Sequence, residues 1–172
     1  WSEERRLVTS PTIQWYYPAL AAKGDLVFVA YAEGALKMLI SRDGGKNWAE
    51  PMVLSGNLPI NFSPAIAIVK DEVVVAWPSI VEMNQTRARQ MFASRSADGG
   101  KTWTPPKQIA QSPNHCLSPR FLSIGSSALL VWQEIPLDSH VGKGLIMHSA
   151  AGLPSKWSKV ILLTPELNRQ YQ

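Results

Sequence analysis

Four polar side chains in this sequence could take part in binding or catalysis. Arg120 directly follows a proline and could bind an anion, because a guanidinium group pairs with a carboxylate through two parallel hydrogen bonds. Asp138 and His140 stand two positions apart in a polar segment, where either could act as a general acid. Glu33 stands in a comparable segment nearer the start of the chain. The structural alternatives are a surface or ion-paired arginine and solvated loop residues.

An aromatic cluster offers a different kind of surface. Tyr16 and Tyr17 follow Trp15, and together the three rings could form a platform on which a flat or ring-shaped ligand stacks. The same rings could instead pack between structural units. Both interpretations remain open at the level of the sequence.

A repeated octapeptide determines how these residues are positioned. Residues 41–48 and 96–103 both fit the pattern S-x-D-x-G-x-(T/N)-W, and residues 149–157 form a weaker copy in which alanine replaces the aspartate. Tryptophans at positions 1, 48, 103 and 157 are separated by 47, 55 and 54 residues, which indicates a repeating structural unit. The structural residues of the pattern are Ser41, Asp43, Gly45, Trp48, Ser96, Asp98, Gly100, Trp103 and Trp157.

The octapeptide is typical of a tight turn between strands. Its glycines tolerate the positive φ angles that such turns require. The aspartate can accept hydrogen bonds from backbone N–H groups a few residues later, and the tryptophan can bury a large apolar area. We therefore assign these residues a structural role, not a catalytic one.

Short apolar runs between the turns predict an all-β chain with three four-stranded units. The units cover residues 18–55, 64–110 and 119–163, and no segment has a convincing helical period. Residues 1–9 are predicted to form the outer strand of a preceding unit, and residues 164–172 to lead into a following one.

Composition narrows the possible functions. The 172 residues suffice for one domain, with 45% hydrophobic and only 17% charged residues. The net charge of +4 favours anionic partners weakly, but the basic residues are scattered, so we expect no nucleic-acid binding. The single cysteine, Cys116, excludes an intrachain disulfide, and the three histidines lack metal-ligand spacing. We expect no metal, no cofactor and no membrane span.

The octapeptides resemble the Asp-boxes, or BNR repeats, of sialidase-type β-propellers. This resemblance implies a propeller fold, commonly with six blades, of which this chain would supply three blades and one orphan outer strand. It also implies a glycan-directed module, part of an exo-sialidase or a related glycoside hydrolase that removes terminal sialic acid or a similar sugar. Some proteins with such boxes are not sialidases, so the alternative is a non-catalytic scaffold that binds protein or carbohydrate.

The resemblance assigns roles to the candidate residues. In sialidases an arginine cluster binds the carboxylate of the substrate, a tyrosine acts as the nucleophile and a carboxylic acid protonates the leaving group. The resemblance implies Asp138 and Glu33 as catalytic residues. It implies substrate binding by Arg120, Tyr16, Tyr17 and His140. The family motif (F/Y)-R-I-P corresponds here to Trp15-Tyr16-Tyr17-Pro18, which retains the proline but lacks the arginine.

Three blades cannot close a ring, so the apolar faces of the first and last blades would be left open. We expect those faces to be covered by the remainder of the propeller or by a second copy of the chain. The resemblance further favours a secreted, periplasmic or cell-surface protein whose ligand is a glycan or another small anionic sugar.

Overall fold

The computed structural model describes residues 3–10, 16–60, 62–83, 86–124, 127–137, 143–150 and 161–162. Within this part of the chain every regular element is a β-strand, which confirms the all-β prediction. Because the described residues form no helix, none of them supplies a helical membrane span.

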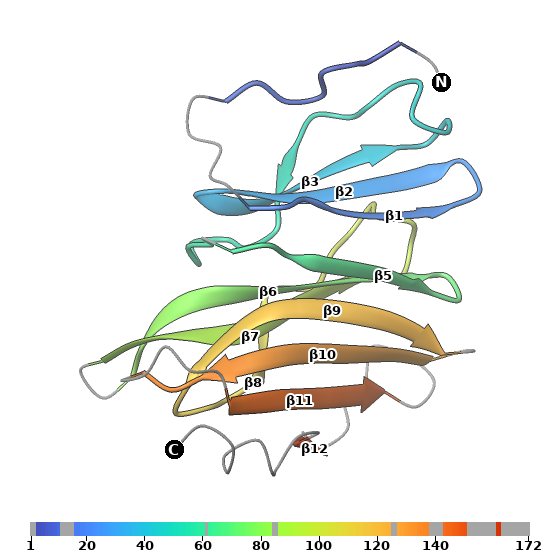
Figure 1. Ribbon diagram of the computed structural model, residues 1–172. Coiled ribbons are helices and arrows are strands. Elements are labelled where there is room, and N and C mark those ends of the chain that lie inside the picture. The colour runs from blue at the N-terminus through green and yellow to red at the C-terminus, as the bar shows by residue number, and fades with distance from the viewer. Residues whose placement is uncertain are drawn as a thin grey trace.

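The strands form three four-stranded antiparallel sheets, each with its strands in chain order (Figure 1). The first sheet contains β1 (Ala19–Lys23), β2 (Leu26–Glu33), β3 (Ala35–Ser41) and β4 (Met52–Val53). The second contains β5 (Ala65–Val69), β6 (Glu72–Met83), β7 (Thr86–Ser96) and β8 (Lys107–Ala110). The third contains β9 (His115–Ile124), β10 (Ser127–Ile135), β11 (Lys143–Ala150) and β12 (Ile161–Leu162).

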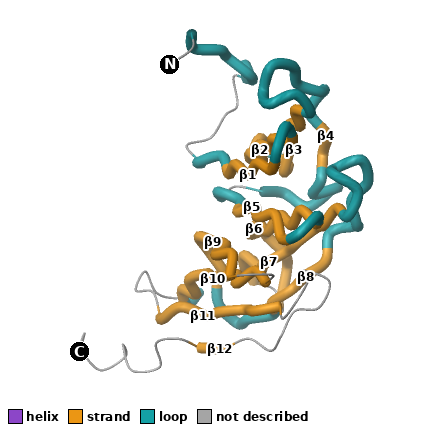
Figure 2. The backbone as a smooth tube through the Cα atoms, turned by 90° about the vertical axis from the view of Figure 1, so that its right-hand side faces the viewer, coloured by secondary structure: helices purple, strands orange, loops and turns teal. Residues whose placement is uncertain are grey.

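The sheets stack face to face with their first strands together. β1 lies beside β5, and β5 lies beside β9. Figure 2 shows these three strands along one edge of the stack, with β4 and β8 along the opposite edge. We call β1, β5 and β9 the inner strands. The end of the stack where they begin is the entry end, and the end with the octapeptide turns is the turn end.

Apolar side chains fill the space between the sheets. On β2, Phe28 and Ala30 join a core shared with Val75 and Trp77 of β6, whereas Val29 faces the other side of the sheet. A second core lies between the second and third sheets and contains Met91, Cys116, Leu130 and Trp132, among others. Burial on both faces explains why the second strand of each unit reads as a nearly continuous apolar run.

The first octapeptide closes a turn through its own side chains. Gly44 and Gly45 have φ angles of 70° and 89°. The Ser41 hydroxyl donates to Asp43 Oδ1 at 2.8 Å and accepts from the Gly45 N–H at 2.8 Å. Asp43 also accepts from the backbone N–H of Asn47 at 2.8 Å and from its side-chain amide at 2.7 Å.

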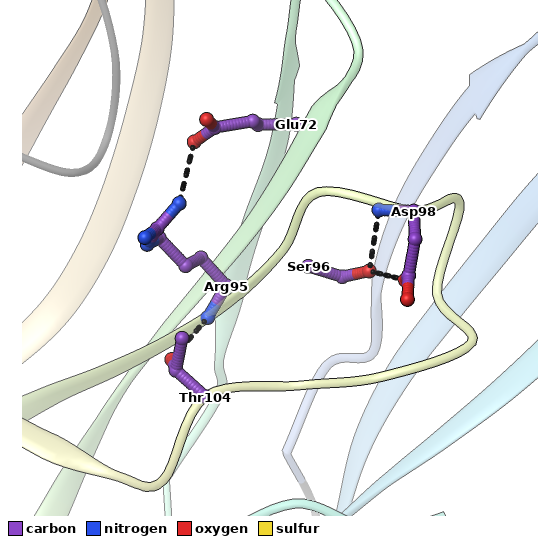
Figure 3. A network of polar contacts seen from close by, with 5 residues as sticks. All are labelled: Glu72, Arg95, Ser96, Asp98 and Thr104. Carbon is purple, nitrogen blue, oxygen red and sulfur yellow. Dashed lines mark hydrogen bonds and ion pairs between the residues drawn. The ribbon is translucent and has the colours of Figure 1, made fainter.

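The second octapeptide repeats this geometry. Ser96 Oγ donates to Asp98 Oδ1 at 2.8 Å and accepts from the Gly100 N–H at 2.8 Å. Asp98 accepts from the Thr102 hydroxyl at 2.6 Å. Figure 3 shows the Ser96–Asp98 contacts on the inside of the turn, together with the Arg95–Glu72 ion pair that joins the adjacent strands β7 and β6.

Residues 3–10 contain no strand, so the outer strand predicted over residues 1–9 is not formed there. The segment instead lies against the outward face of the first sheet. Val8 packs with Val29, Tyr31 and Leu39, and the Arg5 guanidinium donates to the Lys46 carbonyl. The chain thus covers part of the apolar surface of the first sheet with its own N-terminal segment.

The two longest of the described strands are β6 and β7. Their pairing continues past Pro78 as far as Met83 and Thr86. The inner strand β9 begins at His115, ahead of the predicted start of its unit at 119. In both places backbone pairing continues through a proline, which the sequence pattern treated as a boundary.

Candidate functional site

A pocket of about 260 Å³ opens at the entry end, where the inner strands converge. Pro18 and Pro64 immediately precede β1 and β5, and Pro119 stands inside β9. Residues 17–20, 63–66 and 120–121 form the walls, so each sheet contributes one wall. We call this the axial pocket.

Arg120 and Tyr17, which were predicted to bind substrate, both line the axial pocket. Arg120 is exposed, and its Nη1 donates to the Pro119 carbonyl at 2.8 Å. Tyr17 is 77% exposed, and its backbone N–H donates to Ser63 Oγ at 2.9 Å, which ties the first sheet to the entrance of the second. Among the described residues that line the pocket, Arg120 alone carries a formal charge. The pocket thus combines a positively charged guanidinium group with an exposed aromatic ring.

Tyr16 lies outside the axial pocket. Its ring stacks on Phe62 with centroids 5.3 Å apart. The guanidinium of Arg89 lies on the same Phe62 ring, with Cζ 4.7 Å from its centroid. The backbone N–H of Arg89 donates to His115 Nδ1 at 3.1 Å. Burial of the imidazole, and secondly the nearby Arg89 charge, lower the pKa of His115. These contacts link the segments that precede β1 and β5 to β7 and β9.

Glu33 is held in an ion pair at the end of β2. Its Oε2 lies 2.7 Å from Lys37 Nζ, across the tight β2–β3 turn. Hydrogen bonds from Lys37 and Ser10 lower the pKa of Glu33, which favours the carboxylate form. This carboxylate does not line the axial pocket. Asp138, His140 and Trp157, which were also singled out from the sequence, lie outside the described residues.

A buried polar cluster lies where β9 begins and β10 ends, and the sequence analysis did not identify it. Glu134, only 8% exposed, accepts from Asn114 Nδ2 at 3.2 Å and lies 3.8 Å from the Cys116 sulfur. Burial, followed by the adjacent Glu134 carboxylate, raises the pKa of Cys116 to about 12. The thiol therefore stays protonated and unreactive at neutral pH. Glu134 belongs to β10.

A fully buried glutamine fixes the segment that enters β9. Gln90 Nε2 donates to the carbonyls of Ser112 and Asn114 at 2.9 and 3.0 Å, and its Oε1 accepts from the Ser112 N–H at 2.9 Å. A second pocket of about 360 Å³ lies against this segment, between Ser112, Met83 and Leu137, among others. None of the described residues lining it is charged. No simple sequence signal marks Gln90, because a lone glutamine within a strand pattern normally indicates an exposed position.

No protein-family model matches the sequence, and no curated protein matches it either. Solved structures do match. An α-L-arabinofuranosidase of Fusarium graminearum, in complex with an iminosugar inhibitor, has a TM-score of 0.63 and 17% identity over 90% of this chain and 49% of its own. The Penicillium chrysogenum α-L-arabinanase complexed with arabinobiose has a TM-score of 0.62 and 14% identity over 90% of this chain and 50% of its own.

A xylan β-1,4-xylosidase from Bacillus halodurans matches less closely, with a TM-score of 0.57 and 14% identity over 89% of this chain and 33% of its own. The chain thus spans about half the length of the first two structures. None of the three is a sialidase, so the sialidase-type assignment and the six-blade count stay predictions. At these identities the likeness concerns the fold: the three stacked sheets are part of a β-propeller of the kind found in glycoside hydrolases.

Proposed function

We propose that this chain is a glycan-directed module of a propeller glycoside hydrolase, and that its axial pocket holds a terminal acidic sugar such as sialic acid. The observation that carries the proposal is the meeting of Arg120 and Tyr17 in one pocket. The fold shared with an arabinofuranosidase, an arabinanase and a xylosidase supports the glycan part of the proposal.

The chemistry of the pocket suits one acidic sugar residue. Its volume of about 260 Å³ lies near the lower end of the ~300–1,000 Å³ usual for ligand pockets, which fits a single ring better than a chain of several. Arg120 offers two parallel N–H donors to a carboxylate, and Tyr17 offers an exposed ring against which the apolar face of a sugar can lie.

Hydrolysis makes a further demand. Most glycoside hydrolases use two carboxyl groups on either side of the bond that is cleaved, and sialidases replace one of them with tyrosine. No described residue that lines the axial pocket carries a carboxylate, and Glu33 is paired with Lys37. Asp138 remains our candidate for the acid. The same observation favours the second candidate function, a scaffold that binds carbohydrate without cleaving it.

Two parallel assays distinguish these functions. The first measures turnover of a fluorogenic sialoside, with an arabinofuranoside and a xyloside as neutral comparators. The second measures binding of N-acetylneuraminic acid and of arabinose by calorimetric titration. Sialoside turnover supports the hydrolase, and binding of the acidic sugar without turnover supports the scaffold. Binding or turnover of only neutral sugars would overturn the assignment of an acidic ligand.

A further inference from the structure

The inner strand of the third sheet differs from its two counterparts by an irregularity next to Arg120. In the pairing of β9 with β10, Arg120 lies opposite Val131 and Leu117 lies opposite Gln133. Two residues, Ser118 and Pro119, therefore face a single residue of β10. This arrangement is a β-bulge, which adds one residue to a strand and changes the direction of the side chains that follow.

The bulge determines which way Arg120 points. Cys116 lies within the core between the second and third sheets, and Phe121 packs against the same core. These residues are five positions apart, whereas in a regular strand only residues an even number apart share a face. If the same residues formed a regular strand without the bulge, positions 118, 120 and 122 would share the face of Cys116, and the charged Arg120 would turn towards the apolar core.

Both sides of the bulge are anchored. Ahead of it, Gln90 holds the backbone of Ser112 and Asn114, and Glu134 contacts Cys116. After it, Phe121 contacts the core while Arg120 is exposed. The extra residue is thus confined between two fixed points, and the strand cannot absorb it by sliding.

The backbone of the bulge is strained. Ser118 has a φ of 53°, in the left-handed region that glycine normally occupies at the first position of such a bulge. Only one other described non-glycine residue has positive φ: Lys70, at 56°, in the β5–β6 turn at the opposite end of the sheet. Strain of this kind persists where the surrounding structure imposes it, and it is common at binding sites.

We propose that the bulge at Ser118 and Pro119 is a positioning device that turns Arg120 out of the core and into the axial pocket. The contribution of the bulge to ligand binding rests on the proposed function, in which Arg120 binds the acidic sugar. Ser118 and Pro119 themselves are positioning residues and need not touch the ligand.

Three variants test the proposal. Ser118→Val and Ser118→Thr disfavour the left-handed conformation because both introduce a β-branched side chain, and Ser118→Gly keeps the bulge and relieves its strain. Lys70→Val is the matched control, since it places the same strain at a residue of equal φ far from the pocket. Ser118→Val and Lys70→Val are first compared by thermal melting, so that binding is assessed only on folded protein.

Two measurements follow. The rate at which phenylglyoxal modifies Arg120, read by peptide mass spectrometry, reports the exposure of the guanidinium without any ligand. Titration with N-acetylneuraminic acid reports binding. We expect Ser118→Val and Ser118→Thr to slow the modification of Arg120 severalfold and to weaken binding by about tenfold or more, as the loss of a charge-assisted pair predicts. Ser118→Gly and Lys70→Val should match the wild type in both.

The two readouts separate this inference from the proposed function. If the wild type does not bind the acidic sugar, the proposed function fails, while the modification rates still decide whether the bulge orients Arg120. If folded Ser118→Val or Ser118→Thr keeps the wild-type modification rate, the inference is overturned. Should Ser118→Val fail to fold, Ser118→Thr against Lys70→Val decides the question.

Discussion

Arg120 and Glu33 are two charged side chains near the entry end that differ in whether an opposite charge lies beside them. Glu33 is neutralised by Lys37 at 2.7 Å. Among the described residues Arg120 has no carboxylate partner, and its guanidinium donates to the carbonyl of Pro119. A guanidinium that the protein leaves exposed at a pocket is suited to an external anion, whereas a carboxylate already paired with lysine is less available for catalysis.

Replacing Arg120 should therefore affect binding and not folding. We expect Arg120→Ala to weaken binding of N-acetylneuraminic acid by roughly tenfold to a hundredfold, since hydrogen bonds to charged groups contribute about 1.5–3 kcal/mol. Arg120→Lys should recover only part of the affinity, because lysine keeps the charge but loses the two-pronged geometry. Arg87→Ala, at an exposed position of β7, is the control. Equal affinities for all variants in calorimetry would exclude Arg120 from the site.

The aspartates of the two turns predict how stability depends on pH. Hydrogen bonds from Asn47, then from Ser41, lower the pKa of Asp43 from 3.8 to about 2, and bonds from Thr102 and Ser96 lower the pKa of Asp98 as well. A folded-state pKa below the unfolded value stabilises the protein above the unfolded pKa, and this stabilisation is lost as the pH falls towards the folded value.

We therefore expect the urea midpoint of unfolding to fall as the pH is lowered from about 5 to about 2. The variant Asp43→Asn with Asp98→Asn should be less stable at neutral pH and show a shallower decline over the same interval. Parallel curves for wild type and variant would mean that these two carboxyl groups do not account for the acid sensitivity.

At the scale of the element, the octapeptide turn also joins neighbouring sheets. A Cβ atom at Gly100 would lie 2.7 Å from Phe28 Cε1 and 2.8 Å from Ile40 Cδ1, both in the first sheet. At the equivalent position of the first turn, Gly45, the nearest atom would be Trp48 Cζ2 at 3.7 Å, within the same turn. The second turn therefore packs against the sheet that precedes it, so the repeated motif helps to hold the stack together.

This difference gives a matched pair of substitutions. Both glycines have similar positive φ angles, 89° for Gly45 and 81° for Gly100, so alanine should cost each turn about 1–2 kcal/mol of backbone strain. Gly100→Ala should lose a further ~1–3 kcal/mol, because its methyl group overfills the contact with Phe28 and Ile40. Equilibrium unfolding in urea measures both. Equal losses for the two variants would show that the intersheet contact does not constrain the turn.

The elements that follow from local chemistry could be predicted, and those fixed by pairing could not. The apolar run over residues 26–31 predicts β2, which is buried on both faces, and the glycines of the octapeptides predict the positive φ angles observed at 44–45 and 99–100. By contrast, β6 continues through Pro78 because it pairs with β7, and Ser118 adopts a left-handed φ because both sides of it are anchored. Neither feature is marked by a pattern of residue types in the sequence.

The candidate site was predictable to a similar degree. Arg120 and Tyr17 stand next to prolines that precede or interrupt inner strands, so adjacency in the sequence was enough to place them near the pocket. Ser63, Gln90 and Glu134 were not recognised, because their importance depends on partners 20 or more positions away, such as Tyr17, Ser112 and Asn114. Long-range contacts of this kind appear only once the sheets are stacked.

At the scale of the whole molecule, the two end faces of the stack differ. Val8 covers Val29, Tyr31 and Leu39 on the first sheet, and these three residues are at most 9% exposed. On the third sheet, Leu130 and Trp132 of β10 face the inner core, so Leu129 and Val131 face outward by alternation and are only half-buried. Leu122, opposite Leu129, is 57% exposed. The outward face of the third sheet is therefore the more apolar of the two exposed ends among the described residues.

We expect this face to make the 172-residue chain associate in solution. Apolar side chains that protrude together from a sheet favour contact with another apolar surface. In a solution of the isolated chain, the same face of a second molecule provides such a surface. Light scattering should give a mass above 19.0 kDa that falls towards 19.0 kDa on dilution. Leu122→Lys with Leu129→Lys should shift the equilibrium towards the monomer, whereas Val53→Lys, at an exposed residue of β4 in the first sheet, should not. A wild-type chain that stays a monodisperse monomer at every concentration, and unfolds cooperatively, would contradict the prediction.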